Sequence, residues 1–291
     1  MVVRRLGRAG GADAAATAVA AAVAAALAGC SPGAADAVPP AAPRAGAVAA
    51  SGERDGAGGG PLHAVRSAPD LLERAGTSKA GTALEMTTGG TRLTIEGEGV
   101  YDFRAGRGRV RILLPEDGDR PRRGITELFT PGALYMKNRG AGVPVDKWVR
   151  VDTTTLADGN LVTGGATDPG AAAGLLRAAR GVAHVGEARV GGVPVAHYRG
   201  TTDIGAAARL APPRLRGALA AAAKGFTTDT VPFDAYLDEA GRLRKVRHRF
   251  SFANGEREVD VVSTTVLYGF GTPVDLCFPP RRDIYAGKIA G

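Results

Sequence analysis

The side chains best suited to catalysis are scattered along this chain rather than grouped. The four histidines are His63, His184, His197 and His248. None of them is spaced from another histidine or from a cysteine as the ligands of a zinc site are. The sequence also lacks a nucleophile elbow and a glycine-rich phosphate loop. We therefore expect a protein that is not an enzyme and that holds no metal or cofactor.

The thiol of Cys30 has a context that points to chemistry of another kind. Arginines at positions 4, 5 and 8 precede residues 14–26, an unbroken run of Ala, Val and Thr, and residues 27–30 then read LAGC. This order of a basic region, an apolar region and small residues is typical of a secretory signal peptide. The run of 13 residues is shorter than the roughly 20 that span a bilayer. An uncleaved anchor helix with an incidental cysteine is the alternative.

Residues 27–30 resemble the lipobox of bacterial lipoproteins, in which the thiol receives a diacylglycerol and the cysteine becomes the new N-terminus. We therefore predict a lipoprotein signal peptide over residues 1–29 and lipidation at Cys30. Residues 30–60 contain almost no large apolar side chain and are rich in Ala, Gly and Pro, which predicts a flexible tether. A folded domain is expected over residues 61–285, held by the lipid anchor at the extracytoplasmic face of the cell membrane.

The chain has a formal net charge of +8, and its basic side chains are densest at one place. That cluster contains Arg242, Arg244, Lys245, Arg247, His248 and Arg249. No nucleic-acid partner is expected, because the protein is predicted to be exported and no aromatic side chains are interleaved through the cluster. Two interpretations stay open: the solvated face of a strand, or attraction to anionic lipid headgroups.

The second cysteine, Cys277, lies in the apolar stretch 274–278. We expect it to be buried and unreactive, like any small apolar side chain. If Cys30 carries lipid, no internal disulfide is possible, so the fold must depend on packing alone.

Apolar residues recur at helical spacing over residues 62–75, and Gly76 is placed to end that helix. Over residues 79–152 they recur with period two between turn signals, which predicts an antiparallel meander. Two helical stretches follow, at residues 168–180 and before Gly225, with Asp168 and Asp203 as N-caps and a proline pair at 212–213. Further strands are predicted over residues 183–190, 193–201, 231–237, 243–252 and 259–268.

These elements predict an α+β fold, in which a single curved antiparallel sheet, or half-barrel, has helices packed on its concave face. Side chains at every second position of a strand lie on the same side of the sheet. One set of apolar residues should therefore share the concave face and line the core or a cavity. The set is Leu93, Ile95, Val110, Ile112, Leu114, Leu134, Met136, Phe233 and Leu237.

Several segments besides the lipobox carry a resemblance to a known family. They are residues 99–103 (GVYDF), 126–129 (TELF), 134–137 (LYMK), 147–152 (KWVRVD), 191–198 (GGVPVAHY) and 234–238 (DAYLD). Over roughly residues 61–280 the chain thereby resembles the LppX/LprG family of actinobacterial lipoproteins, whose fold is related to that of LolA-type lipoprotein carriers. Tyr236 stands where the family often has Trp.

The resemblance implies a half-barrel whose helices enclose an apolar cavity for acyl chains, with the concave residues named above as ligand contacts. It also implies that the protein binds or carries an acyl lipid or a lipoglycan in the cell envelope, without catalysis, and we expect a monomer. A non-catalytic surface interaction or sensor lipoprotein with a filled core is the alternative.

Replacing the acceptor thiol tests the predicted anchor. A Cys30→Ala protein should stay uncleaved or be lost from the membrane, because stable attachment needs at least two acyl chains. Cell fractionation with mass spectrometry of the N-terminus measures both outcomes, and Cys277→Ala, which leaves the lipobox intact, is the control. Unchanged membrane retention of Cys30→Ala would contradict the prediction.

Overall fold

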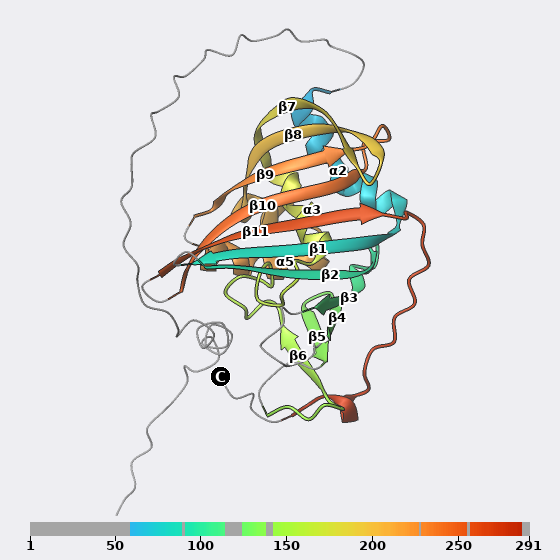
Figure 1. Cartoon of the computed structure of the whole chain (residues 1–291), viewed down its shortest axis with the longest axis vertical. Helices are drawn as coiled ribbons and strands as arrows, with labels where there is room; N and C mark the ends of the chain where they lie inside the picture. The colour runs from blue at the N-terminus through green and yellow to red at the C-terminus, as the bar shows by residue number, and fades with distance from the viewer. Residues whose placement is uncertain are drawn as a thin grey trace, which may run out of the picture.

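The computed structural model describes residues 59–88, 91–113, 124–137, 142–226, 228–254 and 257–286. The predicted signal peptide, Cys30 and the predicted tether up to residue 58 lie outside the described residues, as does Leu114. Within those ranges the chain forms one antiparallel sheet of eleven strands together with four α-helices, so the predicted α+β class is confirmed (Figure 1).

The strands follow one another as two runs in the sequence. The first run is β1 (Thr77–Thr88), β2 (Thr91–Asp102), β3 (Arg107–Leu113), β4 (Gly124–Thr130), β5 (Ala133–Lys137) and β6 (Trp148–Asp152). The second is β7 (Ala179–Val190), β8 (Val193–Asp203), β9 (Thr230–Leu237), β10 (Leu243–Asn254) and β11 (Arg257–Tyr268). Their order in the sheet is β6-β5-β4-β3-β2-β1-β11-β10-β9-β8-β7. Two meanders thus meet where β1 pairs with β11, and β6 and β7 form the two edges.

Strict alternation along the strands separates an apolar face from a charged one. In β3, Val110 and Ile112 are fully buried, whereas Arg109 and Arg111 are exposed. The strand register places Ile112 opposite Ile125 of β4, which is also buried. The period-two pattern of the sequence therefore sets which face of the sheet is buried.

The helices are α2 (Pro61–Ala75), α3 (Pro169–Leu175), α4 (Ile204–Leu210) and α5 (Pro213–Gly225). Both predicted N-caps are confirmed. The carboxylate of Asp168 accepts hydrogen bonds from the backbone N–H groups of Gly170 and Ala171, at 2.7 and 3.2 Å. That of Asp203 accepts one from the N–H of Ala206, at 2.6 Å. Each cap satisfies donors that the first helical turn leaves without partners.

The predicted helix over residues 168–180 is too long. The α-helix ends at Leu175, a 3-10 turn spans Leu176–Ala178, and Ala179 begins β7. Strand pairing explains the difference, because Ala179 lies opposite Thr202 of β8. The hydroxyl of Thr202 also donates a hydrogen bond to the carbonyl oxygen of Leu175, at 2.5 Å. The second meander thus takes over residues that the local sequence assigns to a helix.

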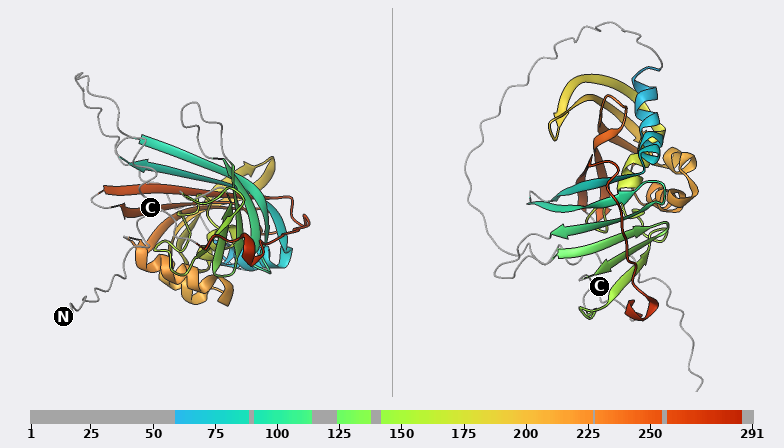
Figure 2. Two further views of the ribbon diagram at one scale, coloured as in Figure 1. Left: turned by 90° about the horizontal axis from the view of Figure 1, so that it is seen from below. Right: turned by 90° about the vertical axis from the view of Figure 1, so that its right-hand side faces the viewer.

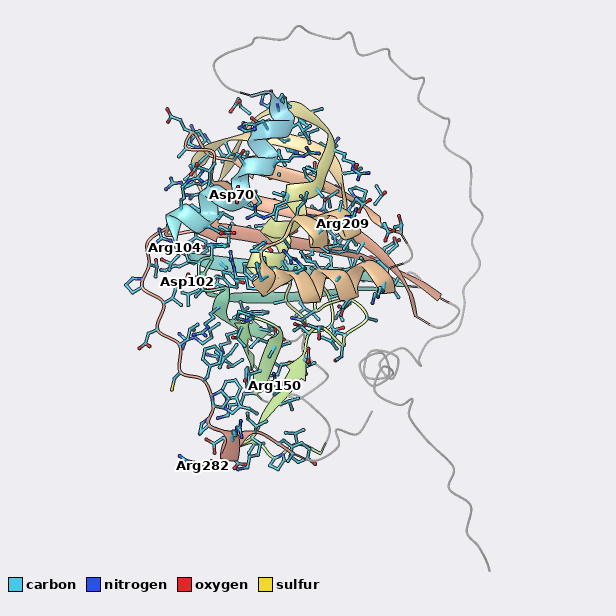
Figure 3. The ribbon with its side chains drawn as sticks, turned by 180° about the vertical axis from the view of Figure 1, so that it is seen from behind. Asp70, Asp102, Arg104, Arg150, Arg209 and Arg282 are labelled. Atoms are coloured by element: carbon cyan, nitrogen blue, oxygen red, sulfur yellow. The ribbon has the colours of Figure 1, made fainter. Side chains whose placement is uncertain are left out.

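The sheet is curved and the helices lie on its inner side (Figure 2). Seen from the helical side, α2, α4 and α5 lie in front of the strands (Figure 3). Helix α2 contributes Val65, Ala68 and Leu72 to the core, all of them fully buried. The core therefore lies between the concave face of the sheet and its cover.

The C-terminal residues 271–286 cross the outer, convex face of the first meander (Figure 2). The ring of Phe278 packs edge-on against Tyr135 of β5, with 5.7 Å between ring centroids. Further on, Ile284 forms a parallel bridge with Trp148 of β6, and the N–H of Tyr285 donates to the carbonyl oxygen of Trp148 at 2.8 Å. The exposed edge of β6 is thereby partly paired, which protects it against pairing with another chain.

Cys277 lies in this C-terminal segment and is exposed, so the prediction that it is buried is wrong. Burial alternates along the segment. Val274, Leu276 and Phe278 are half-buried, and Cys277 points to solvent between the last two. An apolar run that lies on a surface buries only one of its two sides.

Leu128 tests whether the C-terminal segment is part of the fold. Its side chain lies on the convex face, opposite Tyr135, and is only 2% exposed. If the segment covers it, Leu128→Ala should lower the free energy of unfolding by about 2–5 kcal/mol in urea titrations, as for a core leucine. Leu113→Ala, at a position 42% exposed, is the control and should change it by less than about 0.5 kcal/mol. Equal small effects would contradict the packing.

Candidate functional site

The structure brings the predicted concave residues together. Val110, Ile112 and Phe233 are fully buried, and Leu134, Leu237, Ile95 and Met136 are at most 7% exposed. Leu93 is half-buried and packs against the same cluster, while Leu114 lies outside the described residues. All of the described ones belong to a single hydrophobic core on the inner side of the sheet. Their role as ligand contacts stays a prediction.

The concave face is covered in part by a stretch that the sequence did not indicate. We call residues 153–167 the covering segment. It has no helix or strand, yet Leu161 and Ala166 are fully buried and Val162 is 9% exposed. It follows β6 and leads into α3, so it carries the chain over the concave face from one edge of the sheet. Its turn residues Asp158, Gly159 and Asn160 are the only local signal that could have located it.

The covering segment is held by a few specific contacts. The carboxylate of Asp158 accepts hydrogen bonds from the N–H groups of Val162 and Thr163, at 2.8 and 2.6 Å, and so closes a loop. Gly159 lies against the backbone of α5, where a Cβ atom would stand 2.0 Å from the carbonyl oxygen of Ala218. The segment ends at Thr167, whose hydroxyl lies 2.5 Å from that of Ser263 in the middle of β11.

Several buried polar atoms lie in the interior between the sheet and the segments that cover it. Asn160 has the left-handed φ of 65° and is 2% exposed, and neither its amide oxygen nor its amide nitrogen has a hydrogen-bond partner. The same holds for both ring nitrogens of His248 and for the hydroxyl of Thr265. A buried polar group without a partner costs about 1–3 kcal/mol. The interior therefore combines an apolar surface with unpaired polar atoms.

His248 corrects the interpretation of the basic cluster as a uniformly solvated face. It points to the concave side between the rings of Phe233 and Phe250, at centroid distances of 6.4 and 5.8 Å, and is fully buried. The burial lowers the pKa of His248 to about 3. The imidazole is therefore neutral at physiological pH and does not contribute positive charge.

The rest of the basic cluster divides into two parts. Arg242 and Arg244 bind the carboxylate of Asp238, at 2.9 and 3.8 Å, and both guanidinium groups lie over the ring of Phe270. Lys245, Arg247 and Arg249 line the convex face, where Lys245 lies 5.3 Å from the ring centre of Tyr236. Aromatic rings thus do accompany these cations, although they come from other parts of the sequence.

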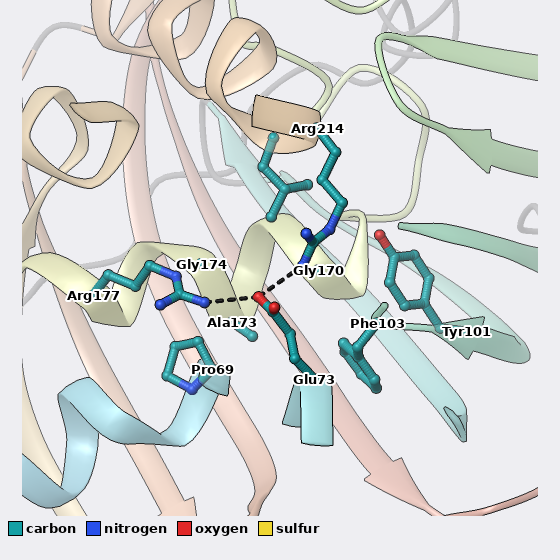
Figure 4. Close-up of a pocket in the computed structure, with 10 residues that line it drawn as sticks. Pro69, Glu73, Tyr101, Phe103, Gly170, Ala173, Gly174, Arg177 and Arg214 are labelled. Atoms are coloured by element: carbon teal, nitrogen blue, oxygen red, sulfur yellow. Dashed lines mark hydrogen bonds and ion pairs between the residues drawn. The ribbon is translucent and has the colours of Figure 1, made fainter. Parts of the chain in front are cut away.

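A second polar feature joins the helices of the cover (Figure 4). The carboxylate of Glu73 in α2 pairs with Arg177, which follows α3, and with Arg214 of α5, at 2.8 and 2.7 Å. Arg177 also pairs with Asp70, at 2.6 Å. The pocket between these residues and Tyr101 has a volume of about 10 Å³, which suffices for one water molecule. At this position the cover leaves room for no more than about one water molecule.

Within the described ranges, no group of three or more His, Cys, Asp or Glu side chains is arranged to hold a metal ion. The helices of the same part of the chain are all too short or too polar to cross a membrane.

No protein-family model matches this chain, and no curated protein has a matching sequence. Its structure resembles that of lipoprotein LppX from Mycobacterium tuberculosis, with a TM-score of 0.39 and 10% identity over 74% of this chain and 96% of that one. For LprF from Mycobacterium bovis the TM-score is 0.40 and the identity 13%, over 75% of this chain and 96% of that one. For a LolA superfamily protein from Nitrosomonas europaea the TM-score is 0.33 and the identity 11%, over 72% of this chain and 94% of that one. The ligand must be inferred from this chain's own residues.

The buried imidazole predicts a stability that depends on pH. The unfolded chain binds a proton at His248 below about pH 6.5, whereas the folded protein does so only below about pH 3. The contribution of the neutral imidazole to the free energy of unfolding is therefore fully present above about pH 6.5. It is lost as the pH falls from there towards about pH 3, by about 1.4 kcal/mol per pH unit. Between pH 6.5 and 5, urea titrations should show a loss of about 2 kcal/mol from this group.

His248→Phe is the matched variant, because it keeps an aromatic ring between Phe233 and Phe250 and removes the titrating group. The other three histidines are unchanged in both proteins, so the difference between the two pH profiles isolates His248. The variant should lose clearly less stability over the same range. Two parallel profiles would contradict the burial of a neutral imidazole.

Proposed function

We propose that the protein is an exported lipoprotein, anchored in the cell membrane through Cys30, that binds or carries an acyl lipid or lipoglycan without catalysis. The lipid would occupy the space between the concave face of the sheet and the covering segment, after the segment has moved outward. The observation that carries this proposal is the covering segment itself. It is an irregular stretch laid over a continuous apolar face that includes Val110, Ile112 and Leu134.

The energetics of an exchange between segment and lipid are favourable. The covering segment buries two large apolar side chains, Leu161 and Val162, each of which contributes about 1.5–3 kcal/mol. An acyl chain gains about 0.8 kcal/mol per buried methylene, so a chain of about sixteen carbons gains roughly 12 kcal/mol. Measured from water, the apolar gain of the lipid therefore exceeds the loss of these two side chains.

The polar atoms under the cover suit an amphiphilic ligand better than a pure hydrocarbon. The imidazole of His248 and the hydroxyl of Thr265 lack hydrogen-bond partners. Ester oxygens and hydroxyl groups of a lipid headgroup could pair with them, and each pair formed would remove a cost of about 1–3 kcal/mol. Chemistry of this kind favours an esterified or glycosylated lipid.

A second candidate function is favoured by the closed state of the core. The concave residues are packed in one cluster, and the pocket beside Glu73 holds about 10 Å³. A filled core of this kind fits a non-catalytic interaction or sensor lipoprotein that uses its outer surface. The two candidates differ in one property that can be measured, which is the presence of lipid in the interior.

Mass spectrometry of organic extracts from the purified protein tests the proposal. Wild-type protein should contain acyl lipid, and Ile112→Trp, which fills the inner side of β3, should contain several-fold less. Overpacking at this buried position also costs about 1–3 kcal/mol of stability. Leu113→Trp, one residue away and 42% exposed on the outer side, is the matched control and should keep the wild-type lipid content.

A lipid-free wild-type extract, together with loss of stability alone in Ile112→Trp, would contradict lipid binding and favour the interaction lipoprotein. Equal lipid in the two tryptophan variants would place the lipid elsewhere than against Ile112.

A further inference from the structure

The convex face of the sheet carries a depression that the proposed lipid site does not use. It has a volume of about 390 Å³, which lies within the roughly 300–1,000 Å³ of small-molecule sites. Side chains from five neighbouring strands line it, and most of them are charged. The charged ones include Arg199, Asp234, Lys245, Arg247 and Arg249. It lies on the side of the sheet opposite the core.

At the base of the depression a buried carboxylate fixes three basic groups. The carboxylate of Asp234, whose side chain is 5% exposed, accepts hydrogen bonds from His197 at 2.8 Å, Arg199 at 3.0 Å and Arg249 at 2.8 Å. Burial alone would raise the pKa of Asp234, but the hydrogen bonds from these three side chains lower it below its usual value. Asp234 is thus ionised at neutral pH and its charge is fully compensated.

The fixed arginines keep donors for a ligand. Arg199 binds Asp234 through Nε and Arg249 through one Nη atom, and their side chains remain 62% and 40% exposed. A guanidinium group has five N–H donors, so each arginine has several left over. Both are held in place in advance, which reduces the entropy that binding must cost.

Two further cations in the depression have no acidic partner among the described residues. Arg247 lies between Asp234 of β9 and Thr264 of β11 in the strand register and forms no ion pair with a described residue. Lys245 lies over Tyr236, whose ring stacks on His197 with 4.3 Å between centroids. The other carboxylate, Glu85, is paired with Arg92. The depression therefore has an excess of positive charge.

We propose that this depression binds a phosphate ester, with the phosphoryl group between Arg247, Lys245 and the free donors of Arg199 and Arg249. A phosphoryl group offers several charged oxygens to several arginines at once, which is the arrangement that guanidinium groups bind best. The volume leaves room for the rest of a small ester. The same chemistry occurs in soluble phosphate esters and in the headgroups of anionic lipids. The site is independent of the proposed lipid interior.

Isothermal titration of the full-length protein in non-ionic detergent tests the site with two probes, glycerol 3-phosphate and dihexanoyl phosphatidylglycerol. Arg247→Gln breaks no ion pair with a described residue and should weaken binding by about tenfold or more, the effect of one lost charge-assisted hydrogen bond. Arg209→Gln makes the same charge change on α4, on the opposite side of the molecule (Figure 3), and should leave affinity within about twofold. Lys245→Gln is the second variant, should Arg247→Gln not fold.

Binding of glycerol 3-phosphate that depends on Arg247 supports a site for soluble phosphate esters. Binding of phosphatidylglycerol alone, with the same dependence, supports a site for a lipid headgroup. Absence of binding for both probes, or equal weakening by Arg247→Gln and Arg209→Gln, would overturn the proposal, because the charge would then act without a specific site.

Discussion

The connection between β6 and β7 is the constraint on which the rest of the structure depends. These strands are consecutive in the chain, yet they form opposite edges of the eleven-strand sheet. Residues 153–178 must therefore cross a face that, if flat, would be about 48 Å wide at about 4.8 Å per strand. Fully extended, they could reach about 85 Å. The connection thus has length to spare, and it uses this length for the covering segment and the short helix α3. It crosses the concave face because that face is apolar, while the other carries side chains such as Arg109 and Arg111.

The composition of this connection determines how firmly it is held. Every residue of α3 is buried, and apart from Pro169 and Leu175 all of them are alanine or glycine. Small side chains let the backbone approach the sheet closely, as where a Cβ atom at Gly170 would stand 2.4 Å from the hydroxyl oxygen of Tyr101. They also bury little apolar area per residue, so the hydrophobic effect stabilises this cover less than it would stabilise a leucine-rich one. The ion pairs around Glu73 are partly exposed, and such pairs contribute about 0–1 kcal/mol each. Local opening of the cover should therefore cost less than opening of the sheet.

Local signals in the sequence were sufficient for most of the sheet and for the helix starts. The alternation of Val110 and Ile112 with arginines located β3 and its buried face, and Asp168 followed by Pro169 located the start of α3. His248 was assigned to the solvent because it stands among basic residues, although its position two residues from both Val246 and Phe250 indicated the concave face. That signal was available in the sequence and was outweighed by the charge of its neighbours.

The covering segment could not be predicted in this way, because it has no periodicity, and the C-terminal segment could not, because its alternation at residues 274–278 does not say which surface it packs on. Tertiary contacts decide the burial in both: Leu161 joins the core cluster, and Phe278 packs on Tyr135. The two clusters of charged side chains could not be predicted from local sequence either. Glu73 meets Arg177, and Asp234 meets Arg249, only once the chain has folded. Contacts between distant parts of the chain, rather than local sequence, bring these groups together.

A reversible lock on the covering segment tests the central claim most directly. The hydroxyl oxygens of Thr167 and Ser263 lie 2.5 Å apart, close enough for cysteines at both positions to form a disulfide. In a Thr167→Cys/Ser263→Cys protein that also carries Cys277→Ser, uptake of a radiolabelled acyl lipid would be compared in the oxidised and the reduced form. If the segment must move for lipid to enter, the oxidised form should bind at most about a tenth of what the reduced form binds, and reduction should restore binding. Equal uptake in the two forms, or no uptake in either, would contradict the account.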